Sequence, residues 1–290
     1  IIYDRIKKRL NKRVKPGLKR LLRQVLYQME IFNAVVCIPS YFQKELLGIL
    51  LLGAKRNGRS FKQDEIDFFI ALSSDVAMAI RNAQLFRELR LELERKQKLF
   101  INTTIALAAA IDAKDHYTHG HTSRVTSLSL LLAEKLKQNK KNIFPERFFE
   151  QLHIASLLHD IGKIGIPEHI LNKKGPLNEE EKRLMQEHTL VGVNILQPIK
   201  ELEDSILGIK YHHEAYDGSG YPEGLKGEQI PLIASIISVA DAYDAMTSDR
   251  PYRSCLSKQE AIEEIKSQSG KKFNPQVVYA LVKLYEEGKL

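Results

Sequence analysis

The residues best suited to chemistry in this chain are its histidines, and all nine lie between His116 and His213. Together with two aspartates, several of them form a series spaced like the ligands of a metal cluster: His121, His159-Asp160, His188, His212-His213 and Asp241. Adjacent His-Asp and His-His pairs are rare by chance, and imidazole and carboxylate groups suit divalent Fe, Mn, Zn or Co. We therefore predict a metal centre.

The segment from Phe148 to Asp160 is expected to be a helix that presents two of these donors. Leu152 and His159 share its inward face at helical spacing, and Asp160 follows about 100° around the axis. We expect Gly162 to end this helix. A carboxylate has two oxygens and can link two cations, which an imidazole cannot do, so Asp160 is the candidate bridging ligand.

Two further helices are expected to carry His188 and Asp241. His188 lies on the apolar face of its helix, four residues after Leu184. A lone histidine there is commonly a hydrogen-bonded core residue, but the other candidate ligands favour metal ligation. The helix that starts at Pro231 carries Asp241, and Asp244 lies on the same side, where its carboxylate can orient a ligating histidine.

From about residue 105 onward, the sequence predicts an all-α bundle whose ligands point inward. Asn178 with Glu181 and Ser257 with Glu260 have the spacing of capping boxes, and Asn274-Pro275 places a cap before a first-turn proline. The two-residue period of strands is absent from this part.

The motifs around the candidate ligands resemble those of the HD-GYP family of cyclic di-GMP phosphodiesterases. The matching strings are HDIGKIGIP from His159, HHEAYDGSGYP from His212, DHYTHGH from Asp115 with Arg124, ILNKKGPL at 170–177 and VADAYDAMTSDRPYR at 239–253. The resemblance runs over most of residues 105–280. It implies a phosphodiesterase that converts cyclic di-GMP to pGpG, with further cleavage to GMP left open.

The resemblance also implies a division of the ligands between two divalent ions, with iron or manganese favoured. The first ion would be held by His121, His159, Asp160 and Asp241, and the second by the shared Asp160 with His188, His212 and His213. Some family members bind a third metal through an acidic residue four positions before the first histidine. Tyr117 occupies that position here, so no third metal is expected.

Substrate contacts are implied in the same way. Lys163 would contact the scissile phosphate, and Arg250 and Arg253 would make further contacts with substrate phosphate. Without the resemblance, Arg250 and Arg253 are exposed surface cations. The loop Gly218–Pro222 offers backbone N–H groups and the Tyr221 phenol, or is simply a packed turn. In the family this loop is also a surface for diguanylate cyclase domains. The residues expected to support the ligands from behind are Asp115, Glu214 and Asp244.

The chemistry expected of this site is attack on a phosphodiester by a hydroxide that bridges two metals. Lys163 and the metals would stabilise the charge that develops on the phosphoryl oxygens, with Asp160 holding both ions. One alternative is another reaction of HD-type sites, such as hydrolysis of a nucleotide or alarmone. A second alternative is a non-catalytic protein that binds cyclic di-GMP or acts as a scaffold.

The N-terminal part has a different pattern. Residues 34–39 and 44–53 predict two strands of a buried sheet, Asn57-Gly58 predicts a turn, and a helix follows. With its strings LLGILLLG and AMAIRNAQLF, this series resembles the C-terminal half of a GAF domain over about residues 31–87. It implies a sensor for an unidentified small ligand. The chain opens at Ile1 rather than at methionine, so we expect further residues upstream.

A long helix is predicted from Asp64 to about Ala113, because neither Pro nor Gly interrupts it. Phe86, Leu93, Phe100 and Leu107 recur every seven residues and predict a parallel coiled coil in a homodimer. The alternative is a helix that packs on its own domain. The expected α+β architecture is thus a GAF-like α/β sensor domain at 1–83, a connecting helix at 84–105 and an all-α HD-type helical bundle at 106–290.

The net charge of +8 is concentrated at one end, because residues 1–30 hold ten Lys/Arg and two Asp/Glu. This segment would lie near an anionic membrane face or form a solvated helix surface. No basic surface stands out on the catalytic part, so no nucleic acid polymer is expected as a partner. No apolar stretch approaches the ~20 residues of a membrane span, and Cys37 and Cys255 lack disulfide-like or metal-like spacing. We expect a cytoplasmic protein.

Overall fold

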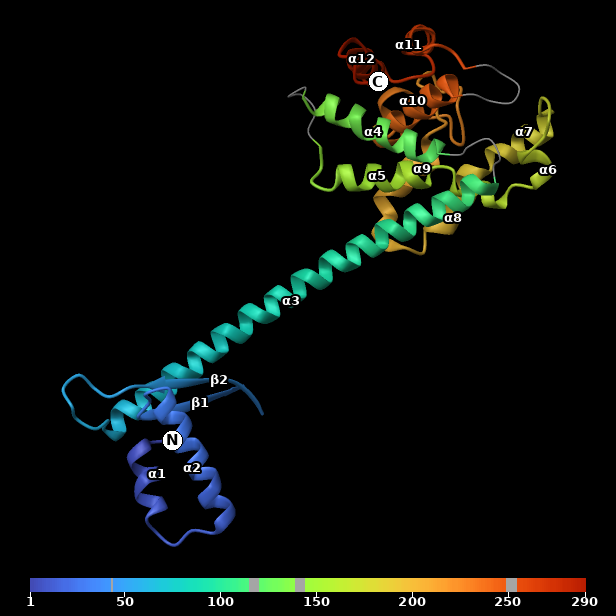
Figure 1. The fold of residues 1–290 in the computed structure, drawn as a ribbon. Coiled ribbons are helices and arrows are strands. Elements are labelled where there is room, and N and C mark those ends of the chain that lie inside the picture. Colours follow the sequence, from blue (N-terminus) through green and yellow to red (C-terminus); the bar gives the residue numbers. More distant parts are fainter. Residues whose placement is uncertain (43, 115–119, 139–143, 249–254) are drawn as a thin grey trace. The chain divides into compact units, whose positions relative to one another are not determined.

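The computed structural model describes residues 1–42, 44–114, 120–138, 144–248 and 255–290. These residues form two compact units, Ile1–Gln97 and Lys98–Leu290, whose ribbons are drawn in Figure 1. The boundary between the units lies within segment 84–105, for which the sequence predicts a connecting helix. The strands belong to the first unit.

The first unit begins with two helices, α1 (Tyr3–Leu10) and α2 (Pro16–Ile31). Proline suits the first position of α2 because it has no N–H to leave unpaired at a helix start. Ile6 of α1 and Met29 of α2 are buried in one small cluster with Cys37. This cluster joins the two helices to the start of the sheet.

The sheet consists of two antiparallel strands, β1 (Val36–Phe42) and β2 (Glu45–Leu52), with Val36 opposite Leu52. The sequence predicts both strands with slightly different ends. It also predicts a buried sheet, but β2 is largely exposed, and Ile49 is 56% accessible to solvent. The reason is that the described sheet has only two strands, so the Leu- and Ile-rich β2 lies at an edge with little packed on it.

Helix α3 (Gln63–Lys114) is 52 residues long, beginning in the first unit and ending in the second. Its ends agree with the prediction to within one residue. The apolar side chains that recur every seven residues are exposed, with Phe86 73% and Leu93 58% accessible. Phe86 and Leu93 therefore have little of the described chain packed on them, whereas Phe100 is 36% accessible. Among the described residues, no helix is both long enough and apolar enough to cross a membrane.

The second unit is built from helices, as its sequence pattern predicts. After the end of α3 the elements are α4 (His121–Lys137), α5 (Phe148–Leu158), η1 (Ile161–Gly165), α6 (Glu168–Leu171), α7 (Glu179–Gln186), α8 (His188–Leu196), η2 (Lys200–Leu202), α9 (Glu203–Tyr211), η3 (Gly227–Gln229), α10 (Leu232–Thr247), α11 (Lys258–Ser267) and α12 (Pro275–Glu286).

One hydrophobic core holds α4, α5, α9, α10 and α12 together. Its fully buried side chains include one from each of these helices, namely Leu132, Leu152, Ile209, Ile237 and Leu281. Burial of side chains of this size stabilises the fold by roughly 1.5–3 kcal/mol each. The core therefore fixes the helices on which the candidate ligands stand.

The predicted helix caps are present. Asn178 with Glu181 and Ser257 with Glu260 form capping boxes at the starts of α7 and α11, and Asn274 caps α12. In each case, the side chain accepts a hydrogen bond from an N–H that the helix leaves unpaired.

The end of α5 differs from the prediction. The helix stops at Leu158, His159 is its C-cap, and after Asp160 the chain enters the 3-10 helix η1. Gly162 thus lies inside η1 instead of ending α5. The change of geometry is coupled to packing, because a Cβ at Gly162 would lie 1.7 Å from the carbonyl oxygen of His188. Only glycine lets η1 approach α8 so closely.

Candidate metal centre

The structure brings the seven predicted ligands together from separate elements. Two groups of donor atoms have all members within 4.8 Å of one another, and they share Asp160. The first group is His121, His159 and Asp160, and the second is Asp160, His188, His212 and His213. Asp241 adjoins the first group, with its Oδ1 atom 3.3 Å from Nε2 of His121. The ligands come from α4, α8 and α10 and from the segments that follow α5 and α9.

Three of the histidines are oriented by the same local hydrogen bond. His159, His188 and His212 each have Nδ1 within 2.7 to 2.8 Å of the carbonyl oxygen three residues earlier. A carbonyl only accepts, so Nδ1 carries the proton and Nε2 keeps its lone pair. These three Nε2 atoms are buried and have no hydrogen-bond partner among the described residues. Converging, unpartnered lone pairs beside a carboxylate fit a bound metal ion.

His121 is oriented differently, by a carboxylate. Its Nδ1 lies 2.7 Å from Oδ2 of Asp244, which also accepts hydrogen bonds from Arg124. Burial lowers the pKa of His121, but hydrogen bonds to Asp241 and Asp244 outweigh that effect and raise the pKa to about 10. The surroundings of this ring therefore favour positive charge, supplied by a proton or by a cation.

Asp160 lies between the two groups of histidines. Its Oδ2 atom is 3.4 Å from Nε2 of His159, and its Oδ1 atom is 3.5 Å from Nε2 of His188. Burial opposes its ionisation, yet Lys163 and the neighbouring histidines hold its pKa well below the usual range. The carboxylate is thus ionised, and each oxygen faces a different histidine group, as a bridging ligand requires.

The second group contains neutral imidazoles. Burial lowers the pKa values of His188, His212 and His213, and neighbouring histidines add to the effect for His212 and His213. The pKa of His213 falls to about 3. Neutral imidazole is the form that binds metal ions, so these residues need no deprotonation near neutral pH.

Lys163 and Tyr221, both predicted substrate contacts, lie at the cluster. The ammonium of Lys163 is 2.7 Å from Oδ2 of Asp160. The ring of Tyr221 stacks on that of His213, with centroids 4.9 Å apart and an interplanar angle of 29°. A cation and a phenol therefore border the candidate ligands.

Glu214 supports the loop that carries Tyr221. It is buried, and its carboxylate accepts hydrogen bonds from the backbone N–H groups of Glu223, Gly224 and Leu225. From the sequence, Glu214 is expected to support the candidate ligands. Its hydrogen bonds instead reach the loop that follows the Gly-Tyr-Pro string. Its effect on the site is therefore through the position of this loop.

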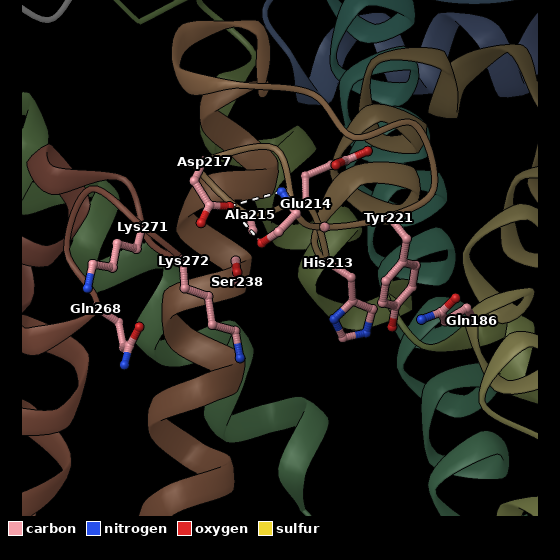
Figure 2. A pocket seen from close by; sticks show the side chains of 12 residues that line it. Gln186, His213, Glu214, Ala215, Asp217, Tyr221, Ser238, Gln268, Lys271 and Lys272 are labelled. Atoms are coloured by element: carbon pink, nitrogen blue, oxygen red, sulfur yellow. Dashed lines mark hydrogen bonds between the residues drawn. The ribbon is translucent and has the colours of Figure 1, made fainter. Parts of the chain in front are cut away.

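A cavity of about 600 Å³ opens beside His213. Figure 2 shows His213 and Tyr221 on one side of it and the side chains of Gln268, Lys271 and Lys272 on the other. Backbone hydrogen bonds connect the two sides of the cavity. The N–H groups of Tyr216 and Asp217 donate to the carbonyls of Lys272 and Lys271. Neither lysine belongs to a motif that the sequence marks as functional.

Three predicted site residues, Asp115, Arg250 and Arg253, lie outside the described residues. So does Tyr117, the residue for which the sequence predicts no third metal. Two kinds of contact in the structure are not predicted from the sequence. One is the salt bridge of Arg124 with Asp244, for which its position three residues after His121 was a signal. The other is the set of backbone carbonyls that orient the histidines. Every residue has a carbonyl, so residue type does not predict these contacts.

Comparison with known proteins assigns the family. The profile of the HD domain family matches residues 105–277, which cover every candidate ligand. The chain belongs to the HD domain family. This membership accounts for the all-helical second unit and for its clustered His and Asp side chains.

HD domain relatives include proteins with named activities. The chain is 46% identical over 178 residues to a cyclic di-GMP phosphodiesterase of Thermotoga maritima, covering 60% of this chain and 46% of the relative. It is 37% identical over 194 residues to a cyclic di-GMP phosphodiesterase response regulator of Xanthomonas campestris, covering 66% and 49%. The chain thus spans about half the length of these curated relatives.

A solved structure supports the fold of this HD domain chain. The crystal structure of a cyclic GMP-AMP-specific phosphodiesterase from Vibrio cholerae aligns with a TM-score of 0.51 at 23% identity, covering 64% of this chain and 48% of that one. At this level of identity, the likeness concerns the fold alone.

Proposed function

We propose that this chain is a metal-dependent phosphodiesterase that hydrolyses cyclic di-GMP to pGpG. One observation carries the proposal: buried Nε2 atoms without hydrogen-bond partners converge with carboxylates on a single cluster. The names of the Thermotoga and Xanthomonas relatives support cyclic di-GMP as the substrate.

Two divalent ions, iron or manganese, would occupy the cluster. His121, His159, Asp160 and Asp241 would hold one, and Asp160 with His188, His212 and His213 the other, in keeping with the two groups of donor atoms. When bound, such ions lower the pKa of coordinated water and neutralise a phosphodiester. Asp244 would keep His121 in the tautomer that presents Nε2.

The protein's own groups would bind and orient the substrate. Lys163 borders the cluster, where its ammonium would stabilise the negative charge that builds on the scissile phosphate during attack. Tyr221, held by its stacking on His213, would limit where a nucleotide can enter. Arg250 and Arg253 remain proposed phosphate contacts.

The cavity beside His213 would receive the part of the dinucleotide that is not cleaved. Lys271 and Lys272 line it, and the ammonium of Lys272 also lies 5.4 Å from the centroid of the Phe273 ring. A cyclic dinucleotide carries a second phosphate, and ammonium groups recognise phosphate as point charges.

We propose Lys272→Met as a test of this cavity. The KM for cyclic di-GMP should rise, whereas Lys258→Met, an exposed lysine at the start of α11, should leave it unchanged.

The first unit would act as a GAF-like sensor of a small ligand, and α3 would form a homodimer through its exposed stripe. The exposure of Phe86, Leu93 and Leu107 on a regular seven-residue spacing supports a helical partner. The Gly-Tyr-Pro loop would serve as a contact surface for a diguanylate cyclase domain.

A product assay with metal analysis tests the main proposal. The full chain, purified without oxygen and loaded with iron or manganese, should convert cyclic di-GMP to pGpG, and His212→Ala should lose both metal and activity. Cyclic GMP-AMP, (p)ppGpp and a dNTP serve as competing substrates. Faster turnover of one of these would assign the site to another nucleotide, and no turnover with both metals bound would leave a binding or scaffold role.

A further inference from the structure

Lys114, the last residue of α3, contacts the turn that carries part of the metal centre. Its ammonium lies 3.1, 2.7 and 2.9 Å from the carbonyl oxygens of Lys163, Ile164 and Ile166. An ammonium has three N–H donors, so this contact uses all of them. Lys163 and Ile164 lie near the end of η1, and Ile166 directly follows it.

The turn is fixed from both sides. On one side, Asn172 donates to the carbonyl of Lys114 at 3.4 Å and so connects the end of α3 to the segment after α6. On the other side, Gly162 packs against the first turn of α8, which begins with His188, and Gly165 packs against Val191. The turn of η1 therefore contacts Lys114 on one side and α8 on the other.

The same turn determines where two functional groups stand. The N–H of Lys163 donates to the carbonyl of Asp160 at 2.9 Å, and the ammonium of Lys163 contacts the Asp160 carboxylate. Since Lys114 binds the carbonyl of Lys163 itself, a shift at Lys114 changes the backbone from which Lys163 projects.

We propose that Lys114 is a positioning residue that transmits a displacement of the end of α3 to Lys163 and Asp160. The inference rests on the proposed function, because the reaction it regulates is the hydrolysis proposed for this site. While Lys114 binds the three carbonyls, the ammonium of Lys163 and the Asp160 carboxylate keep their positions relative to each other. Withdrawal of α3 from η1 frees three carbonyls and loosens the turn without removing any ligand.

Kinetics of the metal-loaded full chain test this role. Lys114→Met keeps most of the side-chain length but removes the donors, and should lower kcat on the order of ten- to a hundredfold, the cost expected for a misplaced reacting group. KM should change much less, because Lys114 does not line the cavity beside His213. Lys114→Arg, which retains several N–H donors, should recover most of the loss. The control, Lys98→Met, changes an exposed lysine of the same helix. Wild-type kcat in Lys114→Met, or no recovery with arginine, would overturn the proposal.

Amide hydrogen exchange provides a readout that needs no substrate. The N–H groups of Lys163 and Ile166 are bonded within the turn, and they should exchange faster in Lys114→Met than in wild type or Lys98→Met, while amides of the α10 core remain protected. Unchanged exchange at both amides would contradict the positioning role of Lys114 even in an active enzyme. If the wild-type chain hydrolyses no cyclic di-GMP, the proposed function fails, whereas the exchange rates still test the positioning role of Lys114.

Discussion

His159, His188 and His212 are oriented by bonds that span three residues. Each follows a helical turn whose carbonyl accepts from Nδ1, so local backbone geometry selects the tautomer. His121 instead depends on Asp244, more than a hundred residues later in the chain. Its orientation is therefore the one among these four that a single side-chain substitution can remove.

Asp244→Asn should weaken metal binding more than it weakens folding. The amide keeps a hydrogen-bond acceptor for His121 but removes the negative charge shared with Arg124. Substitutions of groups that orient metal ligands typically cost 10–100-fold in affinity or activity, and we expect a loss of about that size. Competition with a chelator measures it. Asp204→Asn, at an exposed position on α9, is the matched control, and equal affinity in both variants would contradict the assigned role.

The chelator-treated chain should become less stable as the pH falls below 6.5. The pKa values of His188, His212 and His213 lie below the ordinary 6.5 in the folded chain, so the unfolded chain binds more protons in this range. Each contributes up to about 1.4 kcal/mol per pH unit. His121, with its pKa raised to about 10, adds stability that is complete below pH 6.5 and is lost as the pH rises toward 10. Urea unfolding on both sides of pH 6.5 measures this, and a flat profile below 6.5 would be inconsistent with it.

At the scale of elements, the contact between η1 and α8 aligns the two ligand groups. Asp160 directly precedes η1, and His188 begins α8, so the distance between these elements sets the distance between the Asp160 carboxylate, the proposed bridging ligand, and the His188 imidazole. The contact depends on two glycines, Gly162 and Gly192, whose backbones approach each other. A Cβ at Gly162 would collide with the backbone of α8, whereas a Cβ at Gly192 would come no closer than 3.1 Å to a side chain, that of Ile209.

Gly162→Ala should therefore destabilise the chain and reduce its metal content. The new Cβ would lie 1.7 Å from a backbone oxygen, which cannot move as a flexible side chain does. Overpacking of this kind costs about 1–3 kcal/mol or more. Thermal unfolding and elemental analysis measure the two effects. Gly175→Ala places its Cβ where no atom lies within 4 Å and should behave like wild type. A wild-type Tm for Gly162→Ala would mean that the two elements can separate without cost.

At the scale of the whole molecule, the exposed stripe of α3 predicts how chains associate. Leu93→Glu puts a charge into the proposed dimer contact and should shift the chain from dimer to monomer in sedimentation experiments, since the apolar contacts of a coiled coil are lost. Leu91→Glu makes the same change at an exposed leucine outside the seven-residue series. A dimer that survives the first substitution, or that is lost equally with the second, would argue against this contact.

Much of the architecture follows from local patterns that the sequence displays directly. The extent of α3, the three caps at Asn178, Ser257 and Asn274, and the all-helical second unit are set by interactions within a few residues. The clustering of these histidines and aspartates was also predictable, because adjacent His-Asp and His-His pairs are unusual by residue type alone. The exposure of β2 was not, since burial of a strand depends on what packs over it.

Residue types and their spacing determined by themselves that the chain carries, on a helical scaffold, a set of His and Asp side chains suited to binding metal. Only the tertiary structure decided which oxygen faces which imidazole, that Asp244 rather than a nearby residue holds His121, and that Lys114 reaches the turn of Lys163. The physical reason is range. Caps, turns and helix propensity act between neighbours in the chain, whereas these contacts join residues brought together only when the hydrophobic core fixes the helices.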